Sequence, residues 1–139
     1  MMRNREIVNA GLTAAAALAY VILIGWFAAL EWTLRGSGPV SGRFLMYIVP
    51  LLGECLAAAL VGAGLGYLLR TDRPVVYSVL LGAALALFRW FSTTIYFQNV
   101  HWEDAAWIVA SLLLPAYVAA AATIWLSRRR GSTPANALA

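Results

Sequence analysis

Residues 45–69 have the sequence LMYIVPLLGECLAAALVGAGLGYLL, and this stretch decides the fold. It carries a single charged residue, Glu54, among apolar and small residues. A helix crosses the roughly 30 Å of bilayer hydrocarbon with about 20 mostly apolar residues, because each residue adds about 1.5 Å. The stretch is therefore predicted to be a membrane-spanning helix.

Three further stretches have the same character, at residues 7–30, 75–97 and 105–126. The 139 residues of the chain are 63% hydrophobic and only 12% charged, which leaves too little polar surface for a globule in water. The sequence predicts an all-α integral membrane four-helix bundle that forms a single domain over residues 1–139. Residues 131–139 are rich in Gly, Ser, Pro and Ala, and are predicted to be a disordered tail.

The arginines flank these spans unevenly. Only Arg35 and Arg43 lie near the ends where the first span stops and the second starts. The short flanks at the other ends hold seven arginines: Arg3, Arg5, Arg70, Arg73, Arg128, Arg129 and Arg130. Because cytoplasmic flanks carry an excess of basic residues, the predicted protein is multi-pass in the cell (inner) membrane, with both termini cytoplasmic. This topology accounts for the basic charge, so no nucleic-acid partner is predicted.

Two charged residues, Glu54 and Arg89, fall inside the predicted spans. Each costs about 2.5 to 3.5 kcal/mol at the centre of a helix on insertion scales, so both are expected to face protein or water. They lie nearly the same number of residues from Asp72, in the turn between the second and third spans. Antiparallel packing of these spans brings the two charges level, which predicts an intramembrane ion pair.

Polar side chains accompany the two charges on the same helical faces. Tyr20 in the first span is predicted to lie at the same depth, as is the Ser111 carbonyl, which Pro115 deprives of its usual donor. The predicted intramembrane polar site consists of Glu54, Arg89, Tyr47, Thr93, Tyr96 and Tyr20.

Small residues recur at helical spacing beside the charges and are predicted to be helix-packing positions, because close backbone approach drives helix association in lipid. They are Ala58, Gly62 and Gly66 in the second span, and Ser78, Gly82 and Ala86 in the third. The spacing leaves open whether they pack within one chain or between chains.

The chain lacks the residue patterns of an enzyme: it has no nucleophile–base set, no HExxH motif and no glycine-rich phosphate loop. No catalytic residue, cofactor or metal is predicted. The lone Cys55 offers no thiolate cluster. His101, Glu103 and Asp104 fit no ligand spacing and are predicted to be a solvated connection.

Two functions remain. The leading hypothesis is a non-enzymatic membrane protein that acts through helix–helix association, as an accessory or structural subunit of a larger complex or as a homo-oligomer. Its partners are then the lipid bilayer and other membrane helices. The alternative is a minimal oligomeric transporter or channel that uses the Glu54/Arg89 polar site. In the first case the pair locks the bundle, and in the second it meets a solute.

Overall fold

The computed structural model describes the chain except for residues 1, 36–42, 70, 97–101 and 132–139. Within the helices it also leaves undescribed the side chains of residues 2, 32, 34–35, 43–47, 93–96 and 102–104. The described residues form four helices and no strand: α1 (Met2–Arg35), α2 (Arg43–Leu68), α3 (Pro74–Tyr96) and α4 (Trp102–Gly131). The predicted all-α fold is confirmed.

Each helix contains a stretch long and apolar enough to cross a membrane. These stretches are Arg3–Glu31, Ile48–Leu68, Pro74–Ser92 and Ala105–Gly131. The four helices thus have the architecture of a multi-pass membrane protein, as the hydrophobic segments of the sequence indicate. Helices α1 and α4 run beyond both ends of the predicted apolar segments, because backbone groups near the bilayer surface remain paired when the helix continues into its polar flanks. Helices α2 and α3 match the predicted segments to within two residues at each end. Gly131, predicted to begin the tail, ends α4, and the rest of that tail lies outside the described residues.

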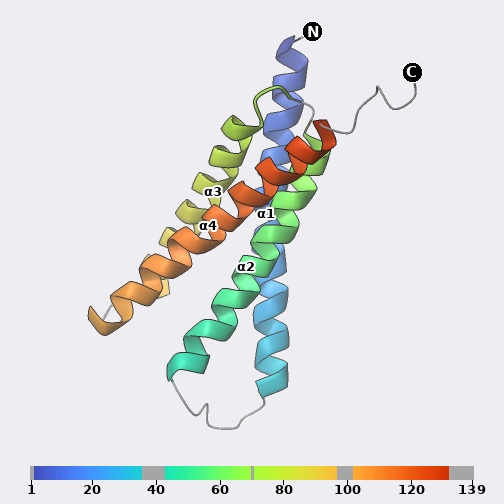
Figure 1. The fold of residues 1–139 in the computed structure, drawn as a ribbon. Coiled ribbons are helices and arrows are strands. Elements are labelled where there is room, and N and C mark those ends of the chain that lie inside the picture. Colours follow the sequence, from blue (N-terminus) through green and yellow to red (C-terminus); the bar gives the residue numbers. More distant parts are fainter. Residues whose placement is uncertain (1, 36–42, 70, 97–101, 132–139) are drawn as a thin grey trace.

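Helix α3 begins directly at Pro74, a residue suited to a first helical position because its ring fixes φ and its missing N–H would have no partner there. The turn before it is held by the Thr71 hydroxyl, which accepts a hydrogen bond from the Arg73 backbone N–H at 3.1 Å. This short connection makes α2 and α3 antiparallel (Figure 1).

The start of α1, the turn between α2 and α3, and the end of α4 lie at the same end of the bundle, here called the terminal end (Figure 1). The end where α1 stops and α2 starts is called the opposite end. The most extensive contacts join α4 to α2 and then to α3, whereas α2 and α3 contact each other little. Helix α1 packs mainly against α2. Helices α2 and α4 converge near the terminal end and diverge toward the opposite end (Figure 1).

Small residues of α2 face α4. A Cβ atom on Gly62 would collide with the Ala119 carbonyl oxygen, and one on Gly66 would lie 2.5 Å from that of Thr123. The Thr123 hydroxyl donates a hydrogen bond across the interface to the Gly62 carbonyl, at 3.0 Å. The same hydroxyl also donates within α4 to the Ala119 carbonyl, at 2.8 Å. Only glycine allows this backbone approach, which supplies the van der Waals contact that holds helices together in lipid.

The small residues of α3 also adjoin α4, since a Cβ on Gly82 would lie 3.2 Å from the Ala116 carbonyl oxygen. Ala58 and Ser78 are fully buried, and Ala86 is half-buried. The sequence leaves the partner of these small-residue faces open. In the structure α4 lies against Gly62 and Gly66 of α2 and against Gly82 of α3, because a small-residue face accepts any helix of suitable crossing geometry.

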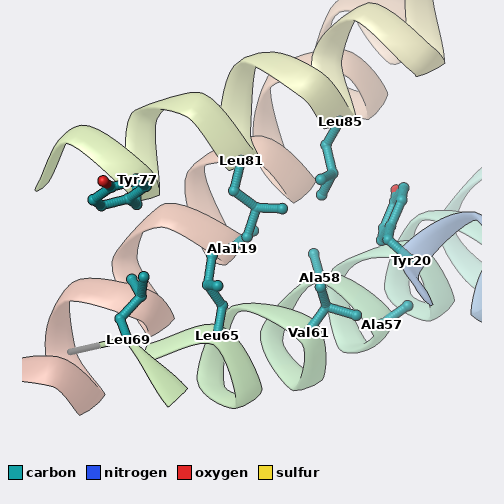
Figure 2. Close-up of a cluster of buried hydrophobic side chains, with 10 residues drawn as sticks. All are labelled: Tyr20, Ala57, Ala58, Val61, Leu65, Leu69, Tyr77, Leu81, Leu85 and Ala119. Atoms are coloured by element: carbon teal, nitrogen blue, oxygen red, sulfur yellow. The ribbon is translucent and has the colours of Figure 1, made fainter. Parts of the chain in front are cut away.

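A buried apolar cluster continues from this contact. In Figure 2, Tyr20 lies at one end of the cluster and Leu69 and Tyr77 at the other. Leu81 and Leu85 of α3 point toward the side of the cluster that α2 forms (Figure 2). The members are Tyr20, Ala57, Ala58, Val61, Leu65, Leu69, Tyr77, Leu81, Leu85 and Ala119.

Candidate functional site

The structure brings the two intramembrane charges together. Arg89 Nη2 of α3 lies 2.9 Å from Glu54 Oε1 of α2, within salt-bridge distance. Glu54 lies about 21 Å along α2 from its end at Leu68, and Arg89 about 22 Å along α3 from its start at Pro74. The pair is therefore level, in the half of the bundle toward the opposite end.

The long arginine side chain makes this contact across a space that the two backbones leave open, since α2 and α3 approach each other little. Gly53 lies beside Glu54, and a Cβ on it would be 3.8 Å from the Phe27 Cβ of α1. Phe27 of α1 therefore packs against α2 at the residue next to the carboxylate. Helix α1 also supplies Tyr20, which is 1% exposed and within electrostatic range of both Glu54 and Arg89.

The hydrogen-bonding capacity of the pair is not used up. Glu54 Oε2 and Arg89 Nε are buried, and neither has a hydrogen-bond partner among the described residues. The Glu54 side chain is 9% exposed and the Arg89 side chain 28% exposed. An unpartnered polar atom in an apolar medium costs free energy comparable to a lost hydrogen bond, and more when the group is charged. The pair therefore keeps one buried acceptor and one buried donor without a hydrogen bond in the described part of the chain.

A cavity of about 830 Å³ adjoins the pair, between α1, α2 and α3. Its lining extends from Glu54 and Arg89 to Leu30 and Glu31 near the end of α1. Most of the wall is apolar, from residues that include Val21, Ile24, Phe27, Val49, Pro50 and Phe88. A volume of a few hundred to about 1,000 Å³, with apolar walls and a few converging polar groups, is typical of a ligand site.

The other predicted site residues divide into two groups. Tyr20 is buried and lies within electrostatic range of the pair, as described above. The side chains of Tyr47, Thr93 and Tyr96 lie outside the described residues, although their backbones belong to α2 and α3. Ser111 is not among the residues that line the cavity, and no described residue of α4 is. The Ser111 hydroxyl donates a hydrogen bond within α4, to the Ile108 carbonyl at 2.9 Å.

The sequence did not single out the apolar residues of the cavity wall. Phe27 and Phe88 are indistinguishable by composition from lipid-facing aromatic residues, so their role depends on the neighbouring helix. Two glycines of the cavity wall, Gly25 and Gly53, are the sequence feature that could have indicated a cavity, because a missing side chain leaves space on a helix face. A glycine-rich membrane helix has too many such positions for that signal to identify a cavity.

The described residues contain no group of three or more side chains that could hold a metal ion. The His101, Glu103 and Asp104 side chains, predicted to be solvated, lie outside the described residues. Arginine and glutamate at the cavity suit a polar or ionic group of an organic partner, because a guanidinium offers several donors in one plane.

Comparison of the chain with family models, with curated proteins and with solved structures gave no match. The features of the chain that bear on its function are the Glu54–Arg89 pair and the cavity beside it.

Proposed function

We propose that the chain is a non-enzymatic membrane protein that associates with other transmembrane helices, and that the cavity beside Glu54 and Arg89 receives the partner. The partner is a helix of a larger complex or of a second copy of this chain. A polar side chain on that helix binds the free acceptor and donor of the pair.

One observation carries this proposal: the ion pair that lines the cavity lacks part of its hydrogen-bond complement. A pair whose sole role is to lock one chain is best surrounded by its own hydrogen-bond partners, because each unpartnered buried group is destabilising. Glu54 Oε2 and Arg89 Nε lack such partners in the described part of the chain. Arg89 is 28% exposed at a depth where the alternative surroundings are lipid tails.

The orientation of the chain is part of the same proposal. The basic flanks gather at the terminal end, so this end faces the cytoplasm and the cavity opens toward the other side. A cytoplasm-active reporter inserted near Asp72 is expected to be active, and an export-dependent reporter at the same site inactive. The reverse result would overturn the orientation and leave the association proposal standing.

Filling the cavity tests the association. Gly25 lines the cavity, and a Cβ on it meets nothing within 4 Å, so Gly25→Leu places a side chain in the cavity without a backbone collision. Gly11, on the same helix, also has open space but does not line the cavity. Gly11→Leu is therefore the matched control.

Tagged and untagged copies are co-expressed, extracted in mild detergent and recovered through the tag, and the co-purified chains are identified by mass spectrometry. We expect a stoichiometric helix partner, a second copy or a different protein, which Gly25→Leu loses and Gly11→Leu retains. Equal recovery of the partner with both variants would contradict a partner in the cavity, as would a chain that is recovered alone.

A transporter or channel is the second candidate, and the volume of the cavity favours it, since about 830 Å³ suits a small solute. Ala28 lines the cavity whereas the adjacent exposed Ala29 does not. In a Cys55→Ala background, a water-soluble thiol reagent is expected to label Ala28→Cys much faster than Ala29→Cys if water enters the cavity.

In proton or cation flux assays on vesicles, Glu54→Asp would then retain flux and Glu54→Gln abolish it. Unlabelled Ala28→Cys without flux would exclude transport.

A further inference from the structure

A second cavity, of about 710 Å³, lies at the terminal end and is independent of the site described above. Three segments far apart in the sequence form it: the first turns of α1, the turn before α3, and the end of α4. Each contributes basic side chains. Four arginines line the cavity, Arg5, Arg73, Arg128 and Arg130, against two carboxylates, Glu6 and Asp72.

The arginines are not neutralised by these carboxylates. In the part of the chain that the structure describes, Arg5, Arg73 and Arg128 form no ion pair. Arg130 is held in place by α2, because its guanidinium donates to the Tyr67 carbonyl and lies 4.8 Å from the centroid of the Tyr67 ring. The cavity thus has an excess of positive charge, with one of its cations fixed.

A polar side chain inside the cavity is also available. Asn9 lines it, is 4% exposed, and its side chain makes no hydrogen bond to another described residue. An amide that can donate, beside guanidinium groups, suits the oxygen atoms of a phosphate.

An apolar groove continues from this cavity along α4. The groove, of about 650 Å³, is lined from Tyr117 to Arg129 and includes Ile124 and Trp125. Arg128 lines both the cavity and the groove, so the two adjoin at its side chain. The groove extends over about 18 Å of helix, a little more than half the roughly 30 Å thickness of bilayer hydrocarbon. That length matches one leaflet.

We propose that the terminal end binds an anionic phospholipid, with the phosphate of the headgroup in the arginine-lined cavity and one acyl chain in the groove along α4. Charge selects the headgroup, and the adjoining apolar groove selects a lipid over a free phosphate ion. The arginines then bind lipid in addition to orienting the chain in the membrane.

The test compares two arginines of one helix. Arg5 lines the cavity, whereas Arg3 is exposed and does not, so Arg5→Gln and Arg3→Gln remove the same charge from neighbouring positions. The purified chain in neutral detergent is titrated with phosphatidylglycerol or phosphatidylcholine of identical acyl chains, and bound lipid is counted by native mass spectrometry. Glycerol phosphate and inorganic phosphate serve as competitors without acyl chains.

We expect one phosphatidylglycerol to bind several-fold more tightly than phosphatidylcholine. An arginine near anionic lipid contributes about 1 kcal/mol, so Arg5→Gln is expected to weaken binding about fivefold and Arg3→Gln less than about twofold. Arg128→Gln, at the junction of cavity and groove, is a second variant and is expected to weaken binding at least as much as Arg5→Gln.

Three results would overturn the proposal. Equal losses for Arg3→Gln and Arg5→Gln would mean that net charge alone attracts the lipid. Equal affinity for the two phospholipids would mean that the arginine-lined cavity does not select an anionic headgroup. Displacement of the lipid by glycerol phosphate or inorganic phosphate at similar concentrations would identify a free-anion site, which the lipid proposal excludes.

Discussion

The two halves of the bundle are held together in different ways. Toward the terminal end, Gly62 and Gly66 let α4 approach α2 until a single added carbon atom would collide with its backbone. Toward the opposite end, a cavity of about 830 Å³ lies between α1, α2 and α3, and an ion pair bridges α2 and α3. Replacing lipid with another apolar side chain gives helices no hydrophobic driving force, so close packing and polar contacts must hold them together.

This difference shows what closes a helix bundle in a membrane. The terminal half closes because small residues allow backbone contact and because the Thr123 hydroxyl donates across the interface. In the other half, large side chains such as Phe27 and Phe88 line the space between the helices. A contact across that space requires a long polar side chain, which Arg89 supplies.

The largest effect is expected from breaking the bridge in the open half. Glu54→Gln leaves Arg89 without its counter-charge at membrane depth, and loss of one partner of a buried pair typically costs 3 to 5 kcal/mol. Because Arg89 is 28% exposed, we expect a loss of about 3 kcal/mol in the free energy of unfolding in detergent micelles.

The control is the double variant Glu54→Gln/Arg89→Leu, in which no charge remains unpaired. It is expected to recover at least part of the loss, since the unpaired arginine is the main penalty. Additive losses from the two single changes would mean that the bridge contributes no coupling between α2 and α3.

An intermediate effect is expected in the closed half. Gly62→Ala forces a Cβ against the Ala119 backbone, and overpacking of this kind typically costs 1 to 3 kcal/mol. Gly64, two residues away on the same helix, has nothing within 4 Å of an added Cβ. Gly64→Ala is therefore expected to be neutral or to stabilise by up to about 1 kcal/mol. Equal unfolding free energies for both variants would show that α2 and α4 are not in backbone contact.

The smallest effect concerns the hydrogen bond between these helices. Thr123→Val removes the donor to the Gly62 carbonyl, and such bonds in membranes average about 0.6 kcal/mol. Thr13 is also buried, but its hydroxyl donates to the Asn9 carbonyl of its own helix, so Thr13→Val is the matched control. We expect the midpoint temperature of thermal unfolding to fall for Thr123→Val and to stay nearly unchanged for Thr13→Val. The opposite ranking would mean that backbone approach alone holds the closed half.

Much of the candidate site could be predicted by counting along the chain. Glu54 and Arg89 are the two charges within the apolar spans, and their positions relative to the turn at Asp72 depend only on the rise of a helix. The cavity beside them could not be predicted in this way. Its walls come from Phe27, Val49 and Phe88, and their common space exists only because three helices diverge around it.

The sequence by itself determined that the chain forms four apolar helices, because hydrocarbon leaves a spanning backbone no other way to pair its polar groups. It also determined which residues are small and which are charged on each helix. Tertiary structure alone decided that α4 covers the small faces of α2 and α3, and that Arg5, Arg73 and Arg128 line one cavity. Helical spacing defines a face, but helix crossing selects its neighbour.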